Sequence, residues 1–163
     1  MRIGKHIACL IALLMLSVSA SNAQIALRAG GGMIVEDSQV GVHGSLVLPF
    51  SSKPAGVLIS AEYYKDSGVT TVPLSARGLY KVVLGSGSIY IGLGSGLIYR
   101  KVDGVAGPDI SSTKALFSSV AGINFKFSGP LGAFGELTMD RALVSGADNN
   151  LAIKAGVSLT ISE

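Results

Sequence analysis

The sequence predicts an all-β fold, an eight-stranded antiparallel up-and-down transmembrane β-barrel. Three observations lead to this prediction. After residue 23, the chain contains eight runs in which apolar and other residues alternate, which is the period-2 pattern of a β-strand. Each run has one face that is apolar and almost free of charge. Only 14% of the 163 residues are charged and the mean hydropathy is +0.54, yet no apolar run is long enough for a membrane-spanning helix.

The predicted strands cover residues 25–36, 39–50, 56–65, 71–83, 88–101, 113–127, 131–142 and 151–161. The segments between them, such as "KDSGVT", "LGSGS" and "VDGVAGPDISS", are rich in Gly, Pro, Asp, Asn and Ser. These residue types form turns. No helical periodicity, internal repeat or linker interrupts this rhythm, so residues 24–163 are predicted to form one barrel domain.

Residues 1–23 have the layout of a cleaved secretory signal peptide. Arg2 and Lys5 form a basic start, and residues 7–18 form a short apolar core before a pair of small residues. A cut after Ala20 is an alternative. The only cysteine lies inside this segment, so the mature chain is expected to contain no disulfide. The remaining chain is nearly neutral, which argues against a nucleic-acid partner.

The two faces of each strand differ in composition. In residues 88–100, "SIYIGLGSGLIYR", one face reads Ile89, Ile91, Leu93, Ser95, Leu97 and Tyr99. The other face has glycines at its centre. An eight-stranded barrel leaves room inside only for side chains. We therefore expect the apolar face to contact lipid and the small, polar face to line the lumen, where glycines at 92, 94 and 96 make space for larger side chains such as Tyr64 or Arg77.

Aromatic residues of the apolar face fall at two levels of the predicted barrel. With the N-terminus in the periplasm, Tyr63 and Tyr99 lie at the external rim, and Phe50, Phe125 and Phe127 lie at the periplasmic rim, with Tyr80 somewhat deeper. Aromatic girdles at both membrane interfaces are typical of outer-membrane barrels. The longer connections then lie outside the cell and the tight turns in the periplasm, although the external "EDS" is short.

The stretches "LRAGGGMIVED", "VPLSARGLYKV" and "YIGLGSGLIYR", together with the signal peptide, resemble the small outer-membrane β-barrel superfamily, the OmpA-type transmembrane domain and its relatives. The resemblance implies a location in the outer membrane of a Gram-negative bacterium, with outer-membrane lipid and the barrel-assembly machinery as partners. It specifies fold and location rather than activity. One departure is the C-terminus "SLTISE", where such barrels commonly end in an aromatic residue.

Two groups of residues are candidates for a functional role. Charged residues on the lumenal face must be paired if they are buried, and the predicted polar network consists of Glu62, Arg77, Lys81, Glu136 and Lys154. The longest external connection carries apolar residues suited to contact with an extracellular protein or glycan, namely Val102, Val105 and Ile110. The predicted role is therefore structural or surface-interacting, without enzymatic activity and without a cofactor.

Two other functions remain open at this point. The only histidine after residue 23, His43, shares its face with Ser45, and some barrels of this superfamily are lipid-modifying enzymes that use a histidine, a serine and an acid. A soluble periplasmic barrel that carries lipid in an apolar lumen would invert the two faces.

Other site chemistry has little support. "GLGSG" lacks the helix that a phosphate loop needs. The loop residues Asp103, Asp109 and Asp148 do not have the spacing of a calcium loop, and no cysteine–histidine cluster suits zinc.

Overall fold

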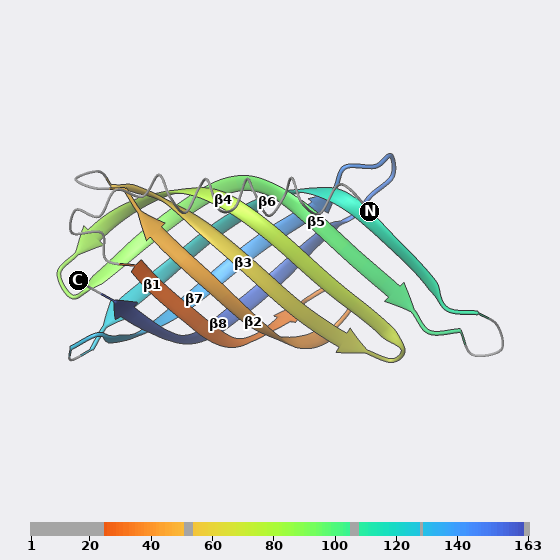
Figure 1. Cartoon of the computed structure of the whole chain (residues 1–163), viewed down its shortest axis with the longest axis horizontal. Coiled ribbons are helices and arrows are strands. Elements are labelled where there is room, and N and C mark those ends of the chain that lie inside the picture. Colours follow the sequence, from red (N-terminus) through yellow and green to blue (C-terminus); the bar gives the residue numbers. More distant parts are fainter. Residues whose placement is uncertain (1–24, 51–53, 105–107, 128, 162–163) are drawn as a thin grey trace.

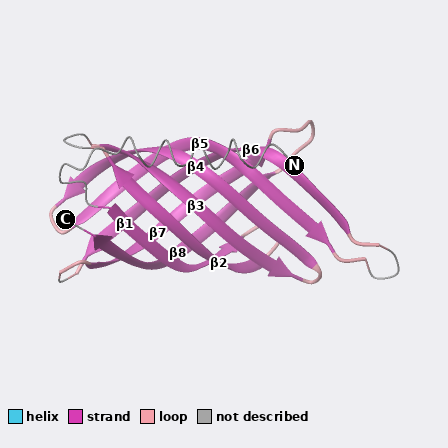
Figure 2. Ribbon diagram, viewed as in Figure 1, coloured by secondary structure: helices cyan, strands magenta, loops and turns pink. Residues whose placement is uncertain are grey.

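The computed structural model describes residues 25–50, 54–104, 108–127 and 129–161, which leaves the predicted signal peptide outside the described residues. Eight strands follow one another along the chain: β1 (Ile25–Ile34), β2 (Gln39–Pro49), β3 (Ala55–Asp66), β4 (Val69–Leu84), β5 (Gly87–Val102), β6 (Ile110–Lys126), β7 (Leu131–Ala142) and β8 (Asn149–Ile161). Each strand pairs antiparallel with its neighbours, and β1 pairs with β8. The result is a closed barrel of tilted strands (Figures 1 and 2), which confirms the predicted fold class. Within the described residues, no helix has the length and apolar character needed to cross a membrane.

The two ends of the barrel differ. At the termini end, on the left in Figure 1, β1 begins and β8 ends, with Ile25 opposite Ile161. The hairpin end carries the connections 35–38, 67–68, 103–109 and 143–148. The β5–β6 hairpin extends farthest from the wall at this end (Figure 1).

The connection between β5 and β6 is shorter than predicted. The sequence pattern assigned residues 102–112 to a loop, but the ladder continues until Val102 pairs with Ile110. Ser111 and Ser112 are polar, which favours a turn in the sequence pattern, yet they pair with Lys101 and Arg100 on β5. Because an unpaired backbone group loses a hydrogen bond, strand pairing prevails over side-chain polarity here.

Two tight turns require glycine. Gly68 at the hairpin end has a φ of 83°, and Gly85 at the termini end has a φ of 59°. This left-handed region is open to glycine but costs energy for residues with a Cβ. Both glycines lie in segments that the sequence predicted as turns.

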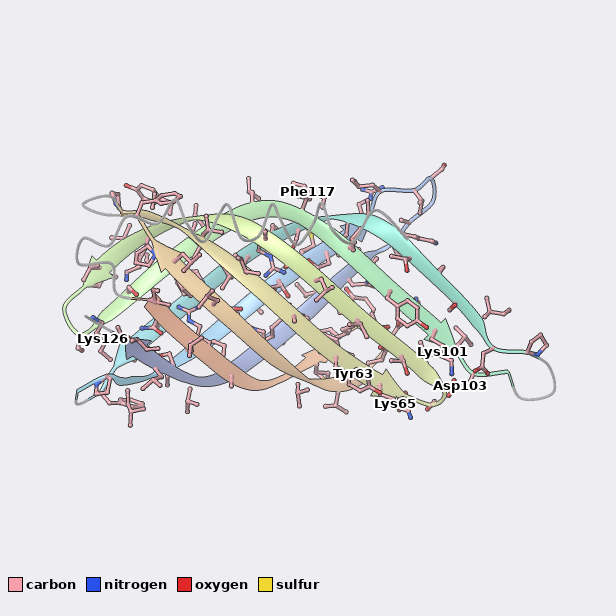
Figure 3. The ribbon with its side chains drawn as sticks, viewed as in Figure 1. Tyr63, Lys65, Lys101, Asp103, Phe117 and Lys126 are labelled. Atoms are coloured by element: carbon pink, nitrogen blue, oxygen red, sulfur yellow. The ribbon has the colours of Figure 1, made fainter. Side chains whose placement is uncertain are left out.

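The outward face of the barrel is apolar, as predicted. Ile91 and Leu93 are each 63% exposed, whereas Arg77 and Tyr64 on the inward face are fully buried. The side chains drawn in Figure 3 project from both faces of the wall, and Phe117, labelled there, is an outward one. A soluble lipid carrier needs the opposite distribution, with an apolar lumen and a polar exterior, so this arrangement contradicts that alternative.

The glycines of β5 lie on the lumenal face, but their neighbours differ from those predicted. A Cβ on Gly94 or Gly96 would overlap the backbone carbonyl of Ala76 or Leu74, on the adjacent strand β4. Gly94 and Gly96 therefore allow close approach of two strands in a strongly curved wall. Gly92 makes space for larger lumenal side chains, as predicted, but these belong to Leu79 and Val120 rather than to Tyr64 or Arg77.

Space for the two lumenal tyrosines comes from other strands. A Cβ on Gly41 would lie 2.6 Å from the Tyr64 ring, and one on Gly122 would overlap the Tyr90 ring. Strand glycines thus allow close approach of neighbouring strands at some positions and make space for lumenal side chains at others.

Two small apolar clusters lie inside the lumen, on either side of its middle. Leu58, Leu79, Tyr90 and Val120 pack together toward the termini end, and Ile34, Tyr64 and Ala152 pack toward the hairpin end. The middle of the barrel is left to polar and charged side chains.

Candidate functional site: the lumenal network and the two mouths

The first half of the lumenal network centres on Glu62 of β3. Its Oε1 accepts a hydrogen bond from Nζ of Lys154 on β8, and its Oε2 accepts one from the hydroxyl of Tyr64 at 2.8 Å. Nη2 of Arg77 lies 3.8 Å from Oε1. These side chains are buried, so Glu62 is a carboxylate whose charge is matched by two cations inside the barrel.

Arg77 of β4 links this carboxylate to a second one. Its Nε donates to Oγ of Ser118 at 2.6 Å, its Nη1 donates to Oγ of Ser60 at 3.0 Å, and its Nη2 lies 3.5 Å from Oδ1 of Asp140. Ser118 in turn donates to Asp140. The planar guanidinium therefore joins β3, β6 and β7 across the lumen, with each nitrogen directed at an oxygen.

The second half of the network centres on Glu136 of β7. Nη1 of Arg28 donates to its Oε1 at 2.8 Å, and the hydroxyl of Tyr90 donates to the same oxygen at 2.7 Å. The guanidinium carbon of Arg28 also lies 5.2 Å from the centre of the Phe134 ring. This cluster lies nearer the termini end, because Arg28 lines the cavity at that mouth.

The buried charges balance. Arg28, Arg77 and Lys154 are matched by Glu62, Glu136 and Asp140. The structure brings together three of the five residues predicted for the network, since Arg77 and Lys154 both approach Glu62.

The remaining two predicted residues lie differently. The predicted network offers Arg77, Lys81 and Lys154 as cationic partners for Glu136, but the structure pairs Glu136 with Arg28, which that network omits. Lys81 is an exposed residue at the mouth of the termini end and lines a cavity there. Asp140 and Tyr90, which the predicted network omitted, share the lumenal parity of the others, so the period-2 pattern alone could have included them.

His43 and Ser45 show no hydrogen bond to each other among the described residues. Both ring nitrogens of His43 and the Ser45 hydroxyl lack a hydrogen-bond partner there. Nε2 of His43 lies 3.9 Å from Oε2 of Glu136, and its ring packs edge-on against Phe134 at 5.4 Å. The geometry resembles a packed lumenal side chain more than a nucleophile with its base.

Two aspartates at the hairpin end contact an ammonium group. Nζ of Lys101 lies 2.9 Å from Oδ1 of Asp103 and 2.6 Å from Oδ2 of Asp109, and the amide of Gly104 donates to Asp109 at 3.2 Å. The hydrogen bond from Lys101 lowers the pKa of the Asp109 carboxyl. Within the described ranges, no group of histidine, cysteine and acidic residues is arranged to hold a metal ion.

The apolar residues predicted for external contact lie on the β5–β6 hairpin. Val102 and Ile110 face each other across the ladder and are 43% and 72% exposed. Val105 lies outside the described residues. Figure 3 shows Lys101 and Asp103 on this hairpin, with Tyr63 and Lys65 near the same end of the barrel.

A cavity of about 260 Å³ opens at the hairpin end beneath these connections. Its lining includes Asp37, Arg100, Lys114 and Asp148. Arg100 pairs with Asp37 at 3.1 Å. This mouth therefore combines cations and carboxylates.

Comparison with known proteins identifies the architecture. No protein-family model and no curated protein sequence matches the chain. Solved structures do. Neisserial surface protein A is 14% identical, with 85% of this chain and 96% of that one covered and a TM-score of 0.62. The N-terminal barrel domain of Pseudomonas aeruginosa OprF is 15% identical, with 88% and 100% covered and a TM-score of 0.65. The fold is that of the small outer-membrane β-barrels.

A third small outer-membrane barrel was solved with a ligand. Ail, the attachment invasion locus protein of Yersinia pestis, in complex with the heparin analogue sucrose octasulfate, is 13% identical, with 88% and 100% covered and a TM-score of 0.59. At such identities the likeness extends to the fold, and the side chains of this chain must be considered on their own chemistry.

Proposed function

We propose that this chain is an outer-membrane protein, exported by a signal peptide at residues 1–23, with a lumen blocked by side chains and a role in surface contact at its hairpin end. The observation that carries the proposal is the apolar exterior of a closed barrel around a charged, hydrogen-bonded interior. In lipid, every backbone group must be paired, and closure satisfies this requirement. The exposed aromatic residues near the two ends suit the two interfaces of a bilayer.

The hairpin end is proposed to face outside the cell. In outer-membrane barrels, the longer connections are external and the periplasmic turns are short. The seven-residue connection 103–109 and the connection 143–148 lie at this end, whereas Gly85 and Gly129 form tight turns at the other. The termini end then faces the periplasm, where a barrel-assembly machinery would deliver the chain.

The contact at the hairpin end is proposed to be with a protein or an uncharged glycan. Val102 and Ile110 offer apolar surface on a hairpin that extends beyond the barrel wall. The described residues of this end carry five cations and six carboxylates, namely Lys65, Arg100, Lys101, Lys114 and Arg141 against Glu36, Asp37, Asp66, Asp103, Asp109 and Asp148. This balance gives a polyanion such as a heparin analogue no net attraction.

Membrane residence is tested by a charge on the outward face. Ile91→Arg places a cation on the outward face of β5 and should cost folding free energy in a bilayer, up to the roughly 2–4 kcal/mol of a cation at the midplane. Ile91→Leu is the matched control and should fold like the wild type. Folding into phospholipid vesicles, followed by gel mobility, measures both. If Ile91→Arg folds normally and remains soluble without detergent, the proposal is wrong.

Surface contact is tested by replacing the connection. Exchange of residues 103–111, which include Ile110, for a short Gly/Ser linker should leave folding intact, because a change in loop length costs little stability. The exchange should also abolish binding to extracellular proteins or glycans, measured with cells that display the protein on their surface. His43→Ala tests the lipid-modifying alternative. Altered outer-membrane lipid in that variant, with surface binding unchanged, would favour an enzyme over this proposal.

A further inference from the structure

The two mouths of the barrel differ in charge. The hairpin end carries cations and carboxylates in nearly equal number. At the termini end, a cavity of about 230 Å³ is lined by Arg28, Lys81 and Lys126, and none of its described lining residues is Asp or Glu. Lys126, labelled in Figure 3, lies at this end, opposite Lys101 and Asp103. The difference does not follow from the fold, because both mouths are formed by ends of the same eight strands.

The cations of this cavity are not equivalent. Arg28 is committed to Glu136 and Tyr90 deeper in the lumen. Lys81 has no carboxylate within ion-pair distance among the described residues, and the charges that act on its ammonium are those of Lys126 and Arg28, both positive. Like charges held near one another are unfavourable unless an anion joins them. Lys81 is therefore the group best placed to gain from an anionic ligand.

The remaining lining is partly apolar, with residues such as Val47 and Leu79, and partly made of groups that suit an oxyanion. Ser88, Tyr90, Asn124, Ser158 and Thr160 present hydroxyl and amide groups to the same cavity. Tyr90 already donates to Glu136, but Ser88 and Thr160 have hydroxyls able to donate. A water molecule occupies about 30 Å³ of liquid volume, so the cavity has room for a phosphate group with several waters.

Lys81 also lines a second cavity, on the outward side of the rim. This cavity is bounded by Pro54, Tyr80, Val82 and Val83, which are largely apolar. Pro49 and Ala55 border both cavities. The Lys81 ammonium thus lies between an apolar outer groove and a polar inner cavity. It can contact a phosphate group from the bulk solution or one on a lipid headgroup.

We infer that the termini end of the lumen is a binding site for a phosphate group, with Lys81 as its principal contact and the hydroxyl groups of the same cavity as further donors. Phosphate oxygens accept hydrogen bonds from ammonium and hydroxyl donors, and the site presents both kinds within one cavity. The inference is independent of the proposed role of the hairpin end, because it concerns the opposite mouth and shares no residue with it.

The test uses the full mature barrel, folded in zwitterionic detergent micelles. In the first arm, inorganic pyrophosphate is titrated and followed by calorimetry. Saturable binding is expected, and Lys81→Gln should weaken it at least tenfold. Lys114→Gln is the matched control, since it removes one cation from the opposite mouth. It should leave the affinity unchanged. Heat-dependent gel mobility of each variant establishes that the barrel is folded.

In the second arm, the protein is equilibrated with mixed micelles that contain phosphatidylglycerol and is analysed by native mass spectrometry. Retention of the lipid by the wild type and its loss in Lys81→Gln would identify a headgroup as the source of the phosphate. Pyrophosphate binding without lipid retention would identify a soluble anion, and either result supports the site. Absence of binding in both arms would overturn the inference, as would an equal loss of affinity in Lys81→Gln and Lys114→Gln.

Discussion

The ion pair between Arg28 and Glu136 offers the sharpest test of the lumenal network. Glu136→Gln keeps the shape of the side chain but removes its charge, so that Arg28 remains buried without a counter-ion. The two groups lie 2.8 Å apart, with side chains 6% and 0% exposed. Removal of one partner from a buried pair costs about 3–5 kcal/mol. We expect that loss in the free energy of unfolding for Glu136→Gln and for Arg28→Met alike.

The double variant distinguishes a specific pair from two independent residues. With both charges gone, neither group is left unpaired, so the loss should fall short of the sum by about 0.5–3 kcal/mol. The matched control is the Glu136→Gln and Lys154→Met cycle. These residues face each other across the β7–β8 ladder, but the Lys154 ammonium bonds to Glu62.

Urea unfolding in phospholipid vesicles, followed by circular dichroism, would give the four free energies of each cycle. A coupling for Arg28 and Glu136 that is clearly larger than the one for Lys154 and Glu136 is expected. Strictly additive losses in the first cycle would refute the assignment of Arg28 as the partner. Coupling confined to the second cycle would restore the pairing that the sequence suggested.

Four further outcomes are expected. Gly94→Ala should sharply reduce the yield of folded barrel in a refolding assay, because a Cβ there overlaps the backbone of β4. Gly44→Ala should fold normally in the same assay, because the nearest atom to a Cβ at position 44 is 4.0 Å away. Tyr64→Phe removes a buried hydrogen bond to a carboxylate and should lower the free energy of unfolding by about 1.5–3 kcal/mol in urea titrations. In planar bilayers, the filled lumen should give little steady ion conductance, and large stable channels would contradict it. Lys101 lowers the pKa of the Asp109 carboxyl, so the contact between them should persist below the ordinary pKa of an aspartate. It should be lost as the pH falls through the lowered pKa of Asp109. The amide signal of residue 104, whose N–H donates to Asp109, would report this loss by NMR.

The assignment of faces could be predicted from sequence because it is a local property. Successive side chains of a strand point to opposite sides, so Ile91 and its neighbours at 89 and 93 must share a face. The choice of that face then follows from composition, since one set of residues is apolar and almost free of charge and the other holds nearly all the charged residues of the strands. Every strand obeys the same rule, and errors at the ends of β4, β5 and β6 do not alter it.

The pairing inside the lumen could not be predicted in this way. Lys154 is directly opposite Glu136 in the ladder, yet its ammonium reaches Glu62, which lies beyond β1 and β2 in the closed barrel. A lumenal side chain can contact any strand that faces it, and strand tilt and stagger decide which one does. Those quantities depend on closure of the whole barrel, not on one strand.

Charged pairs in the lumen also constrain how the barrel can assemble. A one-residue shift of a strand moves all its side chains to the opposite face. If both faces were apolar, such a shift would cost little in a membrane. A shifted β8 would instead expose Lys154 to lipid, at about 2–4 kcal/mol near the bilayer midplane, and leave Glu62 without its hydrogen-bonded cation. A shifted β4 would do the same with Arg77. The buried charges therefore oppose incorrect registers as well as stabilise the correct one.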